Sequence, residues 1–166
     1  MTYIKRKSAR QEKRTSKEFG GKTQIASGAI ETMKGDVRTG ERVAGKFNEN
    51  DFLIENKFTD AESYKLTLAV WNKIAKEAFR DNFRTPLMQI DIQDLEIVVM
   101  DEHLYSIYEL ESRPHSILKF SGKTATLKGA ILGELLDDAD VVALDFYNAK
   151  TKLYVTLKYE FLRLLS

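Results

Sequence analysis

The chain is organised around the stretch Asp51-Phe52-Leu53-Ile54-Glu55-Asn56-Lys57. Its apolar run of three residues is typical of a buried strand. Side chains alternate between the two faces of a strand, so Glu55 and Lys57 should point the same way. Because an acid and a base at the end of a buried strand are costly to desolvate, we interpret them as part of a functional site.

A second acid lies upstream, at the start of another predicted strand, Asp36-Val37. If the two strands pair, the side chains of Asp36, Glu55 and Lys57 converge on one point. Two carboxylates at one point bind a hard divalent cation such as Mg²⁺ through oxygen. Such an ion can activate water for phosphodiester cleavage, and the lysine charge can stabilise the developing anion. The alternative is a set of exposed ion pairs with little effect on stability.

Length and composition exclude several other kinds of site. The chain has 166 residues, enough for one domain with an appendage, and its 31% charged and 43% hydrophobic residues are ordinary for a globular protein. No apolar run approaches the length of a membrane span, so we expect no membrane partner. The absence of cysteine excludes thiolate metal sites, and two histidines, far apart, argue against a histidine-rich zinc site.

Positive charge is concentrated at the N-terminus. Residues 1–23 carry a net charge of +6, whereas the whole chain carries +1. We predict a basic tail over residues 1–7 and a polar helix over residues 8–19, which ends at two glycines. This arm either contacts phosphates or is a solvated terminus. The basic residues that we expect to contact DNA, in the arm and in the loops around Asp36, are Lys5, Arg6, Lys7, Arg10, Lys13, Arg14, Lys34, Arg38, Arg42 and Lys46.

Downstream of the site the pattern alternates between helix and strand. Apolar spacing predicts a helix over residues 66–79, followed by strands over 86–92 and 95–100 that a tight turn joins. Asp101 should cap a further helix that continues to about residue 111.

Residues 117–166 then repeat the pattern of residues 57–109, in the order strand, helix, strand, strand, helix. The second copy has Phe120 and Gly122 where the first has its charged ending. We therefore interpret the second copy as a noncatalytic half that extends the sheet, binds DNA or forms a dimer contact.

An acid followed by an acid-x-Lys on the next strand is the PD-(D/E)xK nuclease arrangement, and here the flanking residues add to it. Ser27-Gly28-Ala29 and Lys34-Gly35-Asp36-Val37 precede the central strand, and a Trp71-containing helix and a strand opened by Pro86 follow it. Over about residues 9–108 this series resembles the PD-(D/E)xK superfamily, most closely its archaeal and phage Holliday-junction resolvase-like branch.

The resemblance implies an α/β fold with a restriction-endonuclease-like core, in which helices flank a mixed central sheet. The core with its basic arm would occupy residues 1–112, and a C-terminal α/β extension would occupy residues 113–166. Glu12, within Ala9-Arg10-Gln11-Glu12, matches the acid of the family's first helix, and Ser27 matches a serine near the scissile phosphate. Gly35 stands where the family usually has proline, and Asn56 where resolvases often have cysteine.

The resemblance also implies hydrolysis of DNA phosphodiester bonds that depends on Mg²⁺ or Mn²⁺. Asp36, Glu55 and the Asn56 carbonyl would hold the cation, with Glu12 bound directly or through water, and Lys57 would assist the attacking hydroxide. We expect a cytoplasmic endonuclease that selects branched DNA, acts as a homodimer and needs no small-molecule cofactor; a phage-encoded enzyme would act in the bacterial cytoplasm. The alternatives are a general DNA-processing or restriction-type nuclease, and a DNA-binding module with a relic site.

Overall fold

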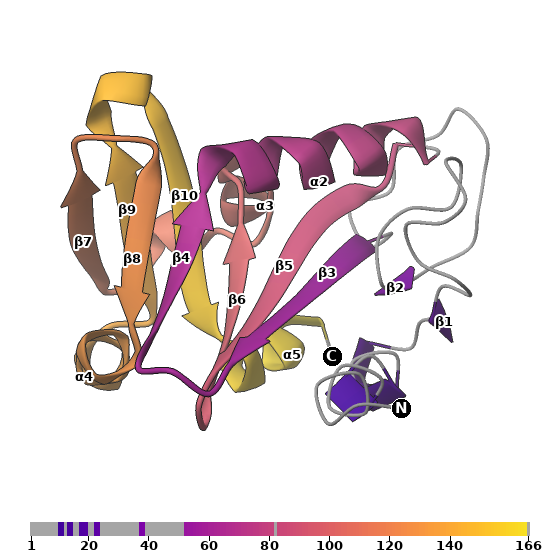
Figure 1. Ribbon diagram of the computed structural model, residues 1–166, viewed down its shortest axis with the longest axis horizontal. Helices are drawn as coiled ribbons and strands as arrows, with labels where there is room; N and C mark the ends of the chain where they lie inside the picture. Colours follow the sequence, from indigo (N-terminus) through magenta and orange to yellow (C-terminus); the bar gives the residue numbers. More distant parts are fainter. Residues whose placement is uncertain are drawn as a thin grey trace. The chain divides into compact units, whose positions relative to one another are not determined.

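The computed structural model describes residues 10, 11, 13, 14, 17–19, 52–81 and 83–165, together with the backbone of residues 22–23 and 37–38. It has the expected α/β class, with helices flanking a mixed central sheet of six strands (Figure 1). β7 and β9 pair in parallel, whereas β10 pairs antiparallel with both β9 and β6. In sheet order, the six strands are β3 (Phe52–Thr59), β5 (Thr85–Ile92), β6 (Leu95–Met100), β10 (Thr151–Leu157), β9 (Val141–Phe146) and β7 (His115–Phe120).

Shorter strands and the helices complete the described part. The two-residue strands β1 (Lys22–Thr23) and β2 (Val37–Arg38) extend the sheet beside β3, and β4 (Ser63–Thr67) pairs with β8 (Thr124–Lys128) in a separate sheet. Residues 10, 11, 13, 14 and 17–19 are helical. The other helices are α2 (Leu68–Arg80), α3 (Glu102–Ile107), α4 (Gly129–Asp138) and α5 (Lys158–Leu165), with short 3-10 helices η1 (Leu110–Ser112) and η2 (Tyr147–Ala149). No helix in this part of the chain is long and apolar enough to cross a membrane.

The residues divide by their contacts into two compact units. One contains Met1–Lys57 and Lys73–Met88, and the other contains Phe58–Asn72 and Gln89–Ser166. The second unit holds all of β4 and every strand from β6 to β10. Neither unit coincides with the predicted segments 1–112 and 113–166, and that division stays a prediction.

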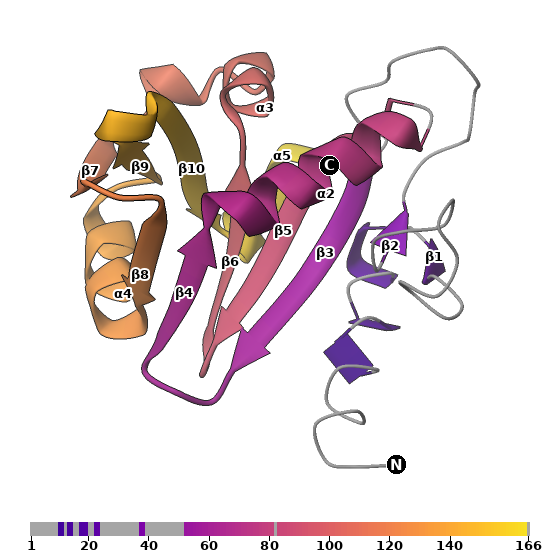
Figure 2. The same ribbon diagram turned by 45° about the horizontal axis from the view of Figure 1, so that its top comes forward.

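Both faces of the sheet are covered in the second unit. In Figure 1, β8 passes in front of β9 and β10, and α4 contacts both β8 and β9. The other face contacts α3 and α5: Tyr105 stacks on Tyr154 of β10 with ring centroids 3.8 Å apart, and Lys158 pairs with Glu96 of β6 at 2.8 Å. Figure 2 shows α4 beside β8 and well separated from α3. The central strands β6, β9 and β10 are therefore mostly buried, which explains their largely apolar sequences, whereas β7 and β8 keep exposed side chains.

The expected internal repeat is confirmed, with one more strand in each half than the sequence predicts. The first half runs β3, β4, α2, β5, β6, α3, and the second runs β7, β8, α4, β9, β10, α5. The sheet has the same symmetry, because β6 and β10 pair at its centre and the other strands follow outward in equivalent order. Both halves thus share one topology.

The additional strand of the first half, β4, changes the predicted start of the following helix. Leu66 was expected on the helix, but it lies in β4, opposite Ala125 of β8, and is fully buried. The helix begins at Leu68, and the Thr67 hydroxyl accepts a hydrogen bond of 3.2 Å from the Val70 amide. The prediction of a helix from residue 66 is therefore wrong, since pairing with β8, a strand distant in the sequence, overrides the local spacing.

The predicted strands and turn that follow are confirmed, and so is the cap at Asp101. β5 ends at Ile92 and β6 begins at Leu95. The Asp101 carboxylate accepts a hydrogen bond of 3.1 Å from the Leu104 amide. The helix ends earlier than expected, at Ile107, because Glu109 adopts the left-handed conformation with φ of 54° and η1 follows.

Asp101→Ala should lower the free energy of unfolding by about 1 kcal/mol, because the mutation leaves a helix-terminal amide without its side-chain acceptor. Urea unfolding followed by circular dichroism measures the change. Glu102→Ala, an exposed substitution one residue later, is the matched control and should change stability by less than about 0.5 kcal/mol. Equal effects of the two substitutions would contradict the capping role.

Burial raises the pKa of Tyr154 to about 12 from 10.0, and the charges of Glu102 and Asp145 and the neighbouring Tyr105 add to the shift. The folded protein therefore keeps the phenol proton when the unfolded chain has lost it. The free energy of unfolding should fall between pH 10 and about pH 12 for this reason. Tyr154→Phe keeps the ring and should make that fall less steep, as urea midpoints at several alkaline pH values would show. An unchanged slope would contradict the assignment.

Candidate functional site

The candidate site lies on β3, where the strand changes from apolar to charged. Phe52, Leu53 and Ile54 are buried, with exposed fractions of 2% or less, which anchors the start of the strand. Glu55 and Lys57 follow with partly exposed side chains, and their Oε1 and Nζ atoms are 3.2 Å apart. The two side chains therefore point the same way, as strand alternation predicts.

The neighbouring strand β2 pairs antiparallel with this part of β3. Val37 is opposite Ile54, and Arg38 is opposite Leu53. On its other edge β2 pairs with β1, with Lys22 opposite Arg38 and Thr23 opposite Val37. The predicted pairing of the two site strands is thus confirmed at these residues. Val37 directly follows Asp36 in the sequence, and Ile54 directly precedes Glu55.

A helical residue near the N-terminus contacts the same strand. Gln11 is buried, with 5% of its surface exposed, and its side-chain amide donates a hydrogen bond of 2.9 Å to the Lys57 carbonyl. On this helix Arg10, Lys13 and Arg14 are exposed, and Arg14 pairs with Glu18 at 3.4 Å. The helix that carries the predicted DNA-contacting residues is therefore held against the backbone of the candidate site.

Gln11 was not predicted as a site residue. Gln11 is buried, whereas Arg10 and Lys13 on the same helix are exposed. A buried polar side chain needs a hydrogen-bond partner. The place of Gln11 directly before Glu12 was the available signal, but the partner carbonyl lies 46 residues away in the sequence. Sequence patterns at helical or strand spacing do not report contacts of this kind.

Much of the predicted site falls outside the described residues. Of the four predicted catalytic side chains, the structure describes Glu55 and Lys57 and brings them together. It describes the backbone of Arg38 but not its side chain. The predicted residues outside the description are Lys5, Arg6, Lys7, Glu12, Ser27, Lys34, Asp36, Arg42 and Lys46.

The described residues offer one carboxylate to a divalent cation. Glu55 supplies it, with about a fifth of its side chain exposed. Oxygen donors of this kind suit Mg²⁺ or Mn²⁺, whereas the nearby lysine cannot bind a metal while charged. Within the described part of the chain no group of three acids or histidines is close enough to hold a metal ion. A complete site therefore requires carboxylates from the remainder, where Asp36 and Glu12 lie.

In comparisons with known proteins, no family model, curated protein or solved structure matches the chain.

Gln11→Ala should lower the free energy of unfolding by about 1 kcal/mol, because it leaves the partly buried Lys57 carbonyl without its donor. Thermal unfolding measures the effect. Lys13→Ala, an exposed change on the same helix, is the control for stability. Equal stability of the two variants would remove Gln11 as an anchor.

Proposed function

We propose that the protein is a metal-dependent DNA endonuclease with a restriction-endonuclease-like fold, and that it cleaves branched DNA. The observation that supports this proposal most is the position of the charged pair: Glu55 and Lys57 lie 3.2 Å apart in the middle of β3, directly after its three buried apolar residues. β2, which begins one residue after Asp36, pairs with that same strand. The motif would need Asp36 to lie beside Glu55, and this pairing brings the neighbouring residue of each strand together.

The proposal requires Asp36 to continue the register of β2 and β3 by one residue. Directly opposed residues of an antiparallel pair have their side chains on the same face of the sheet. With Val37 opposite Ile54, the required partner of Asp36 is Glu55. Two carboxylates so related, with the Asn56 carbonyl and Glu12, would hold Mg²⁺ or Mn²⁺.

The reaction adds water across one P–O bond: the water oxygen bonds to phosphorus, and the deoxyribose oxygen leaves and takes a proton. A bound cation would lower the pKa of the water and offset the charge on the phosphate. The Lys57 ammonium carries a fixed positive charge beside Glu55 and would stabilise the phosphate oxygens as their negative charge grows. The mutual contact of Glu55 and Lys57 orients both groups before the substrate binds.

DNA binding would involve the N-terminal helix. Arg10, Lys13 and Arg14 have exposed side chains on a helix that Gln11 ties to the site strand. Charges of this kind contact phosphates without reading sequence, which suits an enzyme that selects DNA by its shape. An enzyme that processes DNA would act in the cytoplasm.

A cleavage assay on four-way, flap and linear DNA, with Mg²⁺ and with EDTA, tests the proposal. We expect Mg²⁺-dependent cuts close to the branch point and no cleavage by Asp36→Asn. Equal cleavage of linear DNA would favour a general nuclease instead. Binding that weakens with salt, without cleavage under either Mg²⁺ or Mn²⁺, would favour a relic DNA-binding module and overturn the enzymatic proposal.

A further inference from the structure

The two halves of the chain pair as two copies of one unit would. In the β4–β8 pair, Ser63 is opposite Lys128 and Thr67 is opposite Thr124. Adding 61 to a residue number in β4 gives the equivalent residue in β8, so the pairing is the same when the two strands exchange places. The backbone contacts at the ends of these strands follow the same rule. The Leu68 amide donates to the Lys123 carbonyl at 2.9 Å, and the Gly129 amide donates to the Glu62 carbonyl at 3.0 Å.

The second contact between the halves has the same symmetry. At the centre of the large sheet, β6 and β10 pair antiparallel, with Ile97 opposite Leu157 and Met100 opposite Tyr154. In both contacts a strand of one half pairs antiparallel with the equivalent strand of the other, as strands related by a two-fold axis do. Each half alone would leave β4 and the β6 edge unpaired, which is a surface that a protein must cover. In this chain the other half covers both.

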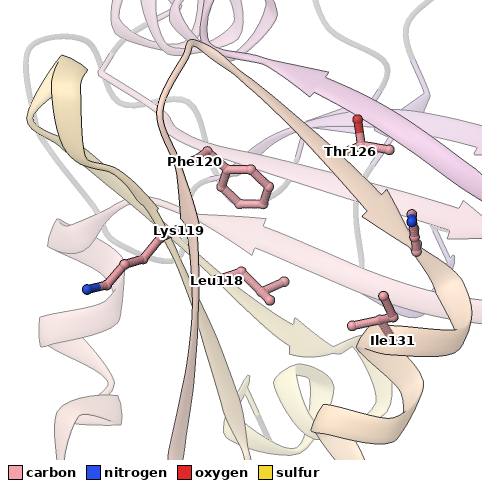
Figure 3. A pocket seen from close by; sticks show the side chains of 6 residues that line it. Leu118, Lys119, Phe120, Thr126 and Ile131 are labelled. Carbon is pink, nitrogen blue, oxygen red and sulfur yellow. The ribbon is translucent and has the colours of Figure 1, made fainter.

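The second half lacks the charged pair of the first. β3 ends at Thr59 and β7 ends at Phe120, and three residues separate each from the next strand. Glu55 and Lys57 therefore correspond to Ser116 and Leu118, and the predicted correspondence with Phe120 and Gly122 is wrong. Leu118, Phe120 and Ile131 line an apolar pocket of about 140 Å³ (Figure 3). Lys119 of the same strand points away from the other labelled side chains. No acid lies in β7, so this position cannot supply a second carboxylate site.

We infer that the second half of each chain takes the place of a partner subunit. The chain therefore has one cleavage site and cuts one DNA strand each time it binds. The inference rests on the proposed function. The interface that would join two copies of the repeated unit is already filled within the chain, so a homodimer through that interface is not needed. Because only one of the two halves carries the charged pair, the product of one binding event is a nick. Cutting the opposite strand requires a second, independent binding event.

A mixing experiment on a cruciform plasmid tests this inference. Wild type is mixed with an equal amount of Glu55→Gln, and nicked and linear products are followed at enzyme excess. If each chain acts alone, nicked DNA should appear before linear DNA, at about half the rate of wild type alone. If a dimer makes paired cuts, linear DNA should form directly, at about a quarter of the rate of wild type alone. Ser116→Ala, the counterpart of Glu55→Gln in the second half, is the matched control and should cut normally.

The mass of the full-length chain in solution, free and on a four-way junction in EDTA, provides a readout that does not need cleavage. One chain per particle supports the inference even if no DNA is cut, and in that case the failure belongs to the proposed nuclease function alone. Two chains per particle together with direct formation of linear DNA would overturn the inference and leave the nuclease function intact. Loss of cleavage in Ser116→Ala, with normal folding, would also overturn it.

Discussion

Glu55→Gln should reduce DNA cleavage by about 10³-fold while DNA affinity in EDTA stays within about twofold of wild type. Glutamine keeps the size of the side chain but removes the negative charge that a cation requires and that Lys57 contacts at 3.2 Å. A metal site is worth several kcal/mol of transition-state stabilisation, so the loss should appear in the rate. The measurement is single-turnover cleavage of a labelled four-way junction beside a binding titration.

The control for this prediction is Glu62→Gln, which changes an exposed acid in the turn that follows β3. It alters net charge by the same amount and should leave the rate unchanged. Lys57→Ala should also reduce cleavage, because it removes the fixed charge beside the phosphate without removing a carboxylate. Cleavage at the wild-type rate by both Glu55→Gln and Lys57→Ala would remove β3 from the chemistry.

Asp81→Ala should destabilise the protein by about 3–5 kcal/mol. Asp81 and Arg84 form an ion pair of 3.1 Å just after α2, and each side chain is 4% exposed. Removing the carboxylate leaves a guanidinium in the interior that cannot lose its proton, and a buried charge without its counter-ion is costly. Chemical unfolding at several urea concentrations measures the loss.

The double substitution Asp81→Ala/Arg84→Met separates two contributions to the free energy of unfolding. One is the cost of a buried guanidinium without the Asp81 carboxylate, and the other is the net stabilisation by the ion pair. Methionine keeps an unbranched apolar side chain at residue 84, so the double variant should recover most of the stability that Asp81→Ala loses. Arg14→Ala is a comparison at the surface, where the pair with Glu18 is partly solvated and should contribute less than about 1 kcal/mol. Additive losses at Asp81 and Arg84 would contradict a coupled buried pair.

Local features of the sequence predicted the local structure well. The apolar run before Glu55 is a buried strand, and Glu55 and Lys57 share a face, because alternation depends only on strand geometry. Asp101 caps α3 because its carboxylate reaches an amide three residues away. The repeat of the two halves was also visible in the order of apolar segments.

Long-range pairing accounts for what the sequence did not predict. β4 is too short to identify alone, and its partner β8 is contributed by the other half of the chain. The contact between Gln11 and the Lys57 carbonyl likewise joins segments whose separation has no sequence signature. The two-fold relation of the halves lies in the pairing of β4 with β8 and of β6 with β10, which joins segments too far apart in sequence for local spacing to report.

We expect Asp36 and Glu55 to bind one divalent cation together. Anomalous diffraction from crystals of the protein grown with Mn²⁺ would locate the ion. The expected result is a single anomalous peak within about 2–2.5 Å of a carboxylate oxygen from each residue. Carboxylates on opposite faces of the sheet, or too far apart for one ion to contact both, would rule out a shared metal site.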